Sequence, residues 1–303
     1  MKISTNGIVI NEYGHVLMIQ RDDTRTLAPP GGGMESGELP PDNTAREIRE
    51  ETGLIAMPVR LTGLYFWQWT ADTPLLAFVF RCIQRGGQMQ TSPESLQVGF
   101  FNVNPLPRSL VNIHRERVLE AWHHQGGPPI WKRQKLSPWG RLGKLIIQRI
   151  VYPWKNLRRR LKKEAPFVPS PVWRVAAHVV IRNKQGQVVW CKQADGRWGL
   201  PGGLCGNDEA PWETAVNHTQ QQTGLTVQLE DLSGVYVTEN EADMVLVFTA
   251  VTPHNTLSTA TNTARHAPGQ EPDTAPPPQI QYVADAVGPQ TETIFRHQST
   301  NER

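Results

Sequence analysis

The sequence has few cysteines, modest charge and no long apolar run. Its 303 residues include only Cys82, Cys191 and Cys205, too few and too widely spaced for a disulfide framework or a zinc site. Charged residues make up 19% and apolar residues 38% of the chain, a balance that excludes a wholly disordered protein. No apolar stretch could span a membrane as a helix, and the first residues contain no secretion signal. We therefore expect a cytoplasmic protein.

Positive charge is concentrated in one segment. Residues 132–163 contain 12 Lys and Arg and no Asp or Glu, which leaves a net charge of −9 on the rest of a chain whose total is +3. Tryptophan and aliphatic residues lie between the basic ones. Three interpretations stay open: an interdomain helix with its bases in water, peripheral contact with an anionic membrane, and binding of RNA or another polyanion. Of the last two, we favour the membrane.

Two halves of the chain repeat one pattern. Three pairs of segments share an offset of 171 residues: Pro30–Gly32 and Pro201–Gly203, Glu38 and Glu209, and Thr52–Leu54 and Thr223–Leu225. A period this long indicates the duplication of a whole domain rather than a short solenoid repeat. We therefore predict one domain over residues 1–128, a basic linker containing tryptophan over 129–170, and a second domain over 171–303.

Both halves predict strands mixed with helices. In the first half, proline in the first turn and glycine after the last place a helix between Pro40 and Gly53, among strands of alternating pattern. In the second half, a Thr-, Ala- and Pro-rich stretch over about 253–278 has the composition of a disordered insertion. Gln279–Val283 is expected to form a late strand. The mixture predicts an α+β or a layered α/β/α domain.

The segment from Gly32 to Leu54 contains the candidate chemistry. On a helix, Glu47, Glu50 and Glu51 share one face because they lie three and four residues apart. Two carboxylates roughly 5 Å apart repel by about 0.8 kcal/mol in water and about 3 kcal/mol at an effective dielectric near 20. A divalent cation such as Mg²⁺, which prefers oxygen ligands, would offset that repulsion. The alternative is a solvated acidic helix face.

The glycines before this helix add to the argument. They allow backbone carbonyls to approach a metal and backbone amides to approach phosphate. Together with the three carboxylates, they suit the metal-assisted attack of water on a phosphate anhydride.

The complete pattern joins Gly32, Glu38 and the run Arg46-Glu47-Ile48-Arg49-Glu50-Glu51-Thr52-Gly53-Leu54. It resembles the Nudix box, here residues 32–54, of the Nudix (MutT-like) hydrolases. The resemblance covers about 1–125 and, more weakly, 172–290. It implies an α/β fold of two tandem Nudix-type α/β/α sandwich domains with mixed sheets. It also implies hydrolysis of the diphosphate linkage of a nucleoside diphosphate derivative or a nucleoside triphosphate, with Mg²⁺ or Mn²⁺.

The same resemblance implies roles for individual residues. Glu50 and Glu51 would be metal ligands, and Glu47 would be a further ligand or the base for the attacking water. Arg46 would orient Glu47, Glu38 would support the loop and the start of the helix, and the carbonyl of Gly31 would complete the metal sphere. The glycine loop at 32–33, Gly32 and Gly33, would contact the substrate.

Two further features are candidates for the site. Glu94 lies in a later loop, where some Nudix enzymes supply an extra carboxylate, and its alternative is an ordinary surface residue. Trp67 and Trp69 alternate along a strand and therefore share a face on which a base could stack. Their alternative role is to cover the core or the sheet.

The second half departs from the pattern at the acidic face. Its equivalent residues are Glu209, Asn217, His218, Gln221 and Gln222, so all three carboxylates and the arginine are replaced. Glutamine keeps the shape of glutamate without the charge that holds a divalent cation. A lone helix histidine such as His218 is more often structural than a ligand. We predict a second domain that keeps the fold and lacks the hydrolase activity.

Two expectations concern the whole molecule. Nudix domains often dimerise, so the tandem would imitate a dimer within one chain. The alternative to an enzyme is a nucleotide-sensing or regulatory module that binds without turnover.

Overall fold

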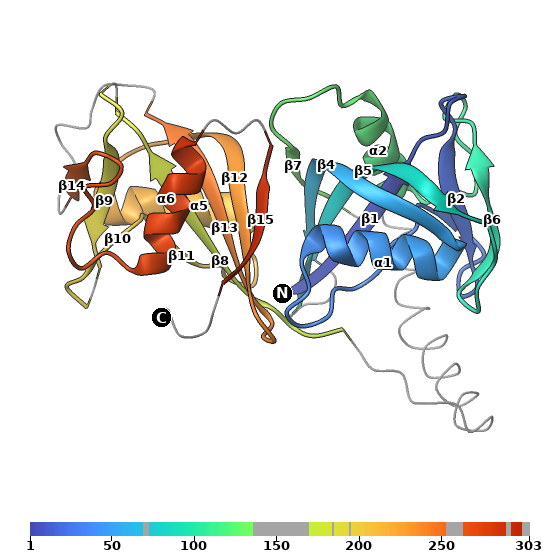
Figure 1. Ribbon diagram of the computed structural model, residues 1–303, viewed down its shortest axis with the longest axis horizontal. Coiled ribbons are helices and arrows are strands. Elements are labelled where there is room, and N and C mark those ends of the chain that lie inside the picture. The colour runs from blue at the N-terminus through green and yellow to red at the C-terminus, as the bar shows by residue number, and fades with distance from the viewer. Residues whose placement is uncertain are drawn as a thin grey trace.

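The computed structural model describes residues 1–68, 73–135, 170–183, 185–193, 195–252, 263–288 and 292–298. Figure 1 shows two sheet-rich halves side by side. The strands of the N-terminal half are β1 (Lys2–Val9), β2 (Val16–Arg21), β3 (Leu27–Ala28), β4 (Leu54–Gln68), β5 (Pro74–Gly87), β6 (Ser95–Phe101) and β7 (Ile130–Arg133), and its helices are α1 (Pro40–Thr52) and α2 (Asn112–His123).

The main sheet of this domain is mixed and lies between its two helices. Its strand order is β1-β5-β4-β7, with β1 parallel to β5 and β4 antiparallel to β5. Neighbouring residues of β5 point to opposite faces, as a strand requires: Phe78 packs in one cluster with Ile48 of α1, and Val79 packs in another with Val118 of α2. These layers confirm the predicted α/β/α sandwich.

The second half repeats this architecture. Its strands are β8 (Arg174–Ile181), β9 (Val188–Lys192), β10 (Trp198–Gly199), β11 (Gly202–Leu204), β12 (Gln228–Thr238), β13 (Asp243–Val251), β14 (Thr263–His266) and β15 (Ile294–Gln298), and its helices are α5 (Pro211–Thr223) and α6 (Pro277–Val287). The main sheet has the order β11-β8-β13-β12-β15. β8 is parallel to β13, as β1 is to β5, and β12 is parallel to β15, as β4 is to β7.

Part of the predicted disordered insertion is ordered, which corrects the sequence interpretation. Residues 263–266 form β14, which pairs with β9, and residues 253–262 lie outside the described residues. The strand expected at Gln279–Val283 is instead part of helix α6, which begins at Pro277. Tyr282 and Val283 are adjacent and both buried in one cluster, whereas neighbouring residues on a strand would point to opposite faces.

The range predicted as a linker begins with a strand of the first domain. β7 pairs with β4, and two basic residues at the start of the predicted basic segment are held by acidic side chains of the domains. Lys132 pairs with Glu116, and Arg133 pairs with Glu213. The rest of the basic segment, from residue 136 onward, lies outside the described residues. In the part of the chain that is described, no helix has both the length and the apolarity to cross a membrane.

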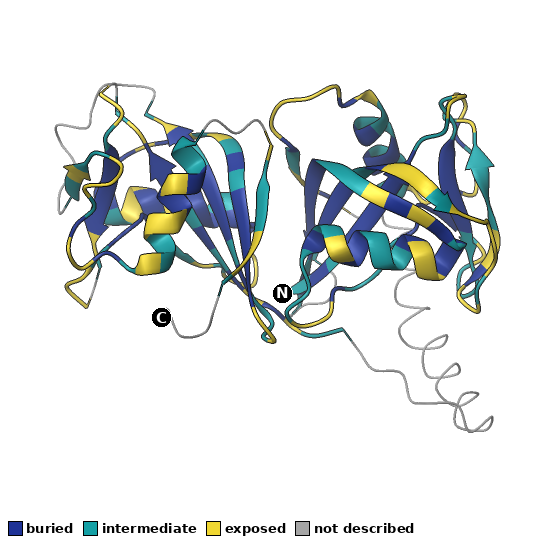
Figure 2. Cartoon of the chain, in the orientation of Figure 1, coloured by how far each residue is buried: buried dark blue, intermediate teal, exposed yellow. Residues whose placement is uncertain are grey.

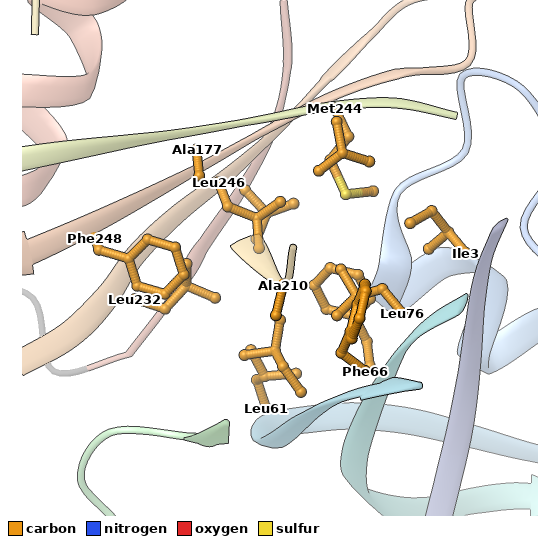
Figure 3. Packing of buried hydrophobic residues seen from close by; sticks show 14 of the residues in the cluster. Ile3, Leu61, Phe66, Leu76, Ala177, Ala210, Leu232, Met244, Leu246 and Phe248 are labelled. Atoms are coloured by element: carbon orange, nitrogen blue, oxygen red, sulfur yellow. The ribbon is translucent and has the colours of Figure 1, made fainter. Parts of the chain in front are cut away.

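One buried cluster continues from the first domain into the second. Leu61, Phe66 and Leu76 of the first domain belong to the same cluster as Leu232 and Phe248 of the second, and Figure 3 shows their side chains facing one another across the boundary. In Figure 2 the edge strand β15 is intermediate to exposed, while β12 and β13 beside it are mostly buried. Burial of apolar surface therefore holds the two domains together as well as each sheet.

Aromatic contacts across this boundary are reciprocal. Trp131 of β7 packs against Phe248 of β13, with ring centroids 5.8 Å apart. Phe80 of β5 packs against Phe295 of β15, with centroids 5.4 Å apart. Because β7 corresponds to β15 and β5 to β13, each domain offers the same two strands to the other. Such an exchange of equivalent contacts is the pattern of a two-fold interface.

Candidate active site

Helix α1 presents the acidic residues because of how it begins and ends. Pro40 and Pro41 occupy its first turn, and its C-cap, Gly53, has φ +71° with its N–H bonded to the carbonyl of Arg49. Ile48 is completely buried in the core beneath the helix. This anchoring directs the neighbouring residues Glu47 and Glu51 toward the loop that precedes the helix.

The glycine loop lies against strand β1. The N–H of Thr5 donates to the carbonyl of Gly32, and the N–H of Gly7 donates to that of Pro30, both over 2.9 Å. A Cβ on Gly31, where φ is +151°, would lie 2.1 Å from the Thr5 oxygen, and a Cβ on Gly32 would lie 2.6 Å from the Glu47 carboxylate. Glycine is therefore required at Gly31, where the clash is with backbone, whereas at Gly32 a larger residue would displace the Glu47 carboxylate.

Glu38 and Arg46 connect the loop to the helix. The Nε of Arg46 donates to Oε1 of Glu38 over 2.8 Å, and Nη2 donates to Oε2 over 3.1 Å. Oε2 also accepts hydrogen bonds from the amide of Asn43 and the backbone of Glu35. Burial alone would raise the pKa of Glu38, but these hydrogen bonds hold it below its ordinary value. Glu38 is therefore an ionised anchor for Arg46 on the loop that precedes the helix.

Arg46 in turn contacts two of the acidic residues. Its Nη1 lies 3.0 Å from Oε1 of Glu47 and 3.0 Å from Oε2 of Glu50. The Glu47 side chain is 13% exposed and that of Glu50 is 59% exposed. The helix thus brings both carboxylates to one guanidinium, with Glu47 turned inward and Glu50 toward solvent.

Glu51 is the most deeply buried of the three glutamates. Its residue is 6% exposed, and its Oε2 accepts a 2.8 Å hydrogen bond from the N–H of Gly31. Burial, with the neighbouring Glu47 charge, raises the pKa of Glu51 to about 8. Burial likewise raises the pKa of Glu47 to about 7, against the lowering effect of Arg46. Near neutral pH, ionising both carboxylates therefore requires more positive charge than these neighbours supply.

Because Glu47 and Glu51 need more positive charge than their neighbours supply, their surroundings can be compared with those that a metal ion prefers. Carboxylate oxygens beside a glycine carbonyl form the hard donor set that Mg²⁺ and Mn²⁺ prefer, and a bound cation would relieve the repulsion between Glu47 and Glu51. Within the described part of the chain, no three Asp, Glu, His or Cys side chains are grouped closely enough to form a metal site as they stand. The donors suit a cation, and Glu50 pairs with Arg46 in this arrangement.

The loop that contains Glu94 lies next to this cluster. The backbone oxygen of Glu94 accepts from Asp22, and the hydroxyl of Ser95 donates to the Glu51 carbonyl. The Glu94 charge helps to raise the pKa of both Glu47 and Glu51. The structure thus brings the candidate extra carboxylate into electrostatic range of the helix.

The equivalent turn in the second domain is arranged differently. Gln222 stands where Glu51 stands in the first, and its Oε1 accepts from the N–H of Gly202 over 2.9 Å. Its Nε2 donates back to the carbonyl of the same Gly202, also over 2.9 Å. The amide therefore occupies both backbone groups, including the carbonyl equivalent to the Gly31 carbonyl that the sequence analysis proposed as a ligand.

The other replaced positions in the second domain keep the packing without the charge. Asn217 donates to Glu209 over 3.0 Å, in place of the Arg46–Glu38 contact. A Cβ on Gly203 would lie 2.5 Å from Nδ1 of His218, just as Gly32 lies against Glu47. The fold of the turn is thus retained while the acidic face is lost.

Sequence reasoning missed a buried cation on the other side of the sheet. Arg117 of α2 is 1% exposed and stacks over the ring of Trp67, 4.5 Å from its centroid. It donates to Oε1 of Gln134 and, over 2.8 Å, to Oδ1 of Asn6. Burial lowers the pKa of Arg117 to about 10. Nothing in the local sequence distinguishes this arginine from surface ones, since only the tertiary contacts bury it.

Of the two candidate tryptophans for base stacking, the structure describes Trp67 but not Trp69. Trp67 is 6% exposed and covers Arg117, while its Nε1 is buried without a hydrogen-bond partner. Trp69 lies outside the described residues.

Sequence reasoning also missed Arg21, whose charge lowers the pKa of Glu51. Arg21 lies on β2 beside the acidic cluster. A basic residue at the end of a short strand has no motif that would have revealed this.

Comparisons with known proteins agree with the repeated pattern. The sequence model described as NUDIX domain matches residues 2–121 and 172–280. A "MutT-like protein" from Streptomyces ambofaciens is 35% identical over 119 residues, which cover 39% of this chain and 75% of that protein. The "ADP-ribose pyrophosphatase" of Methanocaldococcus jannaschii is 30% identical over 127 residues, which cover 40% and 72%.

A third relative is longer than the matched region. The "8-oxo-dGDP phosphatase NUDT18" of Mus musculus is 36% identical over 111 residues, and the match spans 34% of this chain and only 33% of that protein. The family model nevertheless covers most of the chain in two segments, one in each domain. The chain therefore belongs to the Nudix hydrolase family, with two Nudix domains in tandem.

Proposed function

We propose that the N-terminal domain hydrolyses the diphosphate linkage of a nucleoside diphosphate derivative or a nucleoside triphosphate, with Mg²⁺ or Mn²⁺, and that the second domain does not. The supporting observation is the pair of buried carboxylates, Glu47 and Glu51, held against the glycine turn. Their burial-raised pKa values are those of groups prepared for a nearby cation.

The residues of this chain would have separate roles in holding the metal and in accepting a proton. Glu50 and Glu51, with Glu47 and the Gly31 carbonyl, would hold the metal. When bound, the ion neutralises phosphate charge and lowers the pKa of water. Glu47, as a further ligand or as the base that would accept the proton of the attacking water, lies beside the glycine loop and next to Arg46.

Orientation of that base comes from the charged network around it. Arg46 fixes the Glu47 carboxylate, and Glu38 fixes Arg46 through two hydrogen bonds. The N–H groups of Gly32 and Gly33 would contact the substrate phosphates, since the carbonyl of Gly32 accepts from Thr5 and that of Gly33 accepts from Asn43.

The second domain is proposed to be inactive for two reasons that reinforce each other. It has no carboxylate at positions 218, 221 and 222, and Gln222 hydrogen-bonds the Gly202 carbonyl that a metal would need. We also propose that this domain takes the place of a second subunit, because equivalent strands exchange equivalent aromatic contacts across the boundary.

The names of the relatives suggest which substrates to try first. They are described as acting on ADP-ribose and on 8-oxo-dGDP, so a panel should contain both, with unmodified nucleoside di- and triphosphates and dinucleoside polyphosphates. Products are separated by chromatography after incubation with Mg²⁺, with Mn²⁺ and with EDTA. We expect hydrolysis of at least one compound that stops in EDTA.

The same panel separates the enzyme from its alternative. Tight binding of a nucleotide, measured by calorimetry, without turnover in any metal would identify a nucleotide-sensing module and contradict the proposed hydrolysis. Turnover that persists in EDTA would contradict the metal dependence alone.

A further inference from the structure

A turn of the second domain reaches the Nudix box of the first. Residues 239–242 connect β12 to β13, and the turn is closed by a hydrogen bond from the N–H of Glu241 to the carbonyl of Thr238. Asn240 has φ +60°, and only Arg25 shares a positive φ among the non-glycine residues that the structure describes. Figure 1 shows the tip of this hairpin beside the loop that precedes α1.

The contact is made between two backbones. The N–H of Gly37 donates to the carbonyl of Glu241 over 2.9 Å. Gly37 has φ +75°, and a Cβ at this position would lie 2.6 Å from the backbone nitrogen of Asn240. Glycine is needed here both for the left-handed conformation and for the close approach of the turn.

Gly37 is one residue away from the anchor of the acidic cluster. Glu38 receives two hydrogen bonds from Arg46, and Arg46 contacts both Glu47 and Glu50. A shift of the loop at Gly37 would therefore move Glu38 and, through Arg46, the proposed base. The path from the turn to Glu47 consists of directly bonded groups.

The loop of the second domain is held in another way. At the position equivalent to Gly37, the carbonyl of Asp208 accepts a hydrogen bond from the side chain of Arg133. Beside that loop lies a cavity of about 310 Å³, lined in part by Cys205, Asn207 and Pro74. The backbone contact is thus made to the loop of the first domain, which retains its acidic residues. The loop of the second domain is contacted by the side chain of Arg133 instead.

We propose that the β12–β13 turn of the degenerate domain is a positioning element for the active domain. The turn fixes the box loop at Gly37 and so maintains the relative positions of Glu38, Arg46 and Glu47. The inference rests on the proposed function for its effect on turnover, but the contact itself does not. It assigns the second domain a part in catalysis without any chemistry of its own.

The test changes the turn and leaves the box intact. In the full chain, Asn240→Val forces a β-branched residue into a left-handed conformation that it strongly disfavours, whereas Asn240→Gly keeps that conformation. We expect Asn240→Val to lower kcat by about 10-fold, since small misplacements of catalytic groups have effects of this order or larger. KM should stay within about twofold, because no substrate contact changes. Asn240→Gly should stay close to the unsubstituted protein.

A matched control removes general effects of turn strain. Gly196 lies in another turn of the same domain with φ +83°, and a Cβ there would meet nothing within 4 Å. Gly196→Ala therefore strains a turn without touching the box loop, and its kcat should be unchanged. An equal loss of kcat in Gly196→Ala and Asn240→Val would overturn the proposal, because it would show a general loss of stability.

Hydrogen exchange gives a readout that does not need activity. In Asn240→Val we expect the amides of residues 34–38 to exchange at least about 10-fold faster, while those of residues 202–204 keep their rates. Unchanged exchange at 34–38 with unchanged kcat would refute the positioning role. If the unsubstituted protein hydrolyses nothing in the nucleotide panel, the proposed function fails, and exchange alone decides whether the turn holds the loop.

Discussion

The two domains share a glycine turn but use its backbone differently. In the first, Oε2 of Glu51 accepts a hydrogen bond from the N–H of Gly31. In the second, Gln222 bonds both the N–H and the carbonyl of Gly202. Exchanging a carboxylate for an amide therefore preserves the packing, removes a charge and occupies a backbone oxygen at the same time.

The two domains also differ in the side chains buried on the other face of each main sheet, beneath α2 in the first and α6 in the second. The first domain buries the cation of Arg117, bonded to Gln134 and stacked on Trp67. The second places Tyr282 there, whose hydroxyl donates to Gln298 over 2.6 Å. The buried cation is thus replaced, while Asp285, which is 5% exposed, accepts from Tyr236 and pairs with Arg296 on this face of the second domain.

The largest expected effect comes from making the first site resemble the second. We expect Glu50→Gln combined with Glu51→Gln to lower nucleotide turnover at least about 1,000-fold, because several kcal/mol of metal-dependent charge stabilisation is lost. Product formation at saturating Mg²⁺ measures this effect. Gln221→Ala, at the exposed position equivalent to Glu50, is the control and should retain full turnover. Full activity in the double variant would refute the assignment of the site.

A smaller effect is expected from pH in the absence of metal. The folded-state pKa of Glu51, about 8, lies above its ordinary value of 4.5, so the folded protein holds this proton more tightly than the unfolded chain does. The associated stability is complete below about pH 4.5 and is lost as the pH rises through about 8. In EDTA, we expect Glu51→Gln to lessen the loss of stability between pH 5.5 and 8.5 by roughly 2–4 kcal/mol.

Calorimetric unfolding scans of both proteins measure this difference. Added Mg²⁺ should stabilise the unsubstituted protein at pH 8.5 and have little effect on Glu51→Gln, because a ligand that binds only the folded state stabilises it. Identical pH profiles for the two proteins would show that Glu51 is not the titrating group. Gln222 has no charge to titrate, so the second domain should contribute nothing to this difference.

The smallest effects are expected in the interiors of the two domains, at Arg117 in the first and Tyr282 in the second. Arg117→Leu leaves the side-chain oxygens of Asn6 and Gln134 without their donor, and we expect it to lower the free energy of unfolding by about 2–3 kcal/mol. Tyr282→Phe removes one hydrogen bond to Gln298 and should cost about 1 kcal/mol. Urea unfolding measures both. A larger loss for Tyr282→Phe would mean that the buried cation is not the more critical of the two groups.

Local sequence signals were sufficient for the elements around the box. Proline at Pro40 and Pro41 and glycine at Gly53 predict the limits of α1 closely, because both residues act through their own backbone geometry. The same signals misled at α6. Its prolines were read as part of a disordered stretch, and its residues 279–283 were read as a strand, because a short apolar run has no period that separates strand from helix.

The candidate site was predictable as a set of residues, but not as a set of contacts. The spacing of Glu47, Glu50 and Glu51 follows from helix geometry. The burial of Glu51 and the exposure of Glu50 depend on which side of the helix faces the sheet and the glycine loop. Arg21 and Arg117 had no local signal, since each matters through residues distant in the chain.

The sequence by itself determined the duplication, the acidic helix and the loss of that acidity in the second copy, because these depend on residue identity and short-range spacing. Only the tertiary structure decided that Gln222 occupies the Gly202 carbonyl, that a cation is buried behind the first sheet, and that the turn at Asn240 holds the loop at Gly37. These contacts join residues far apart in the chain, and their geometry is set by packing the two domains on one shared core.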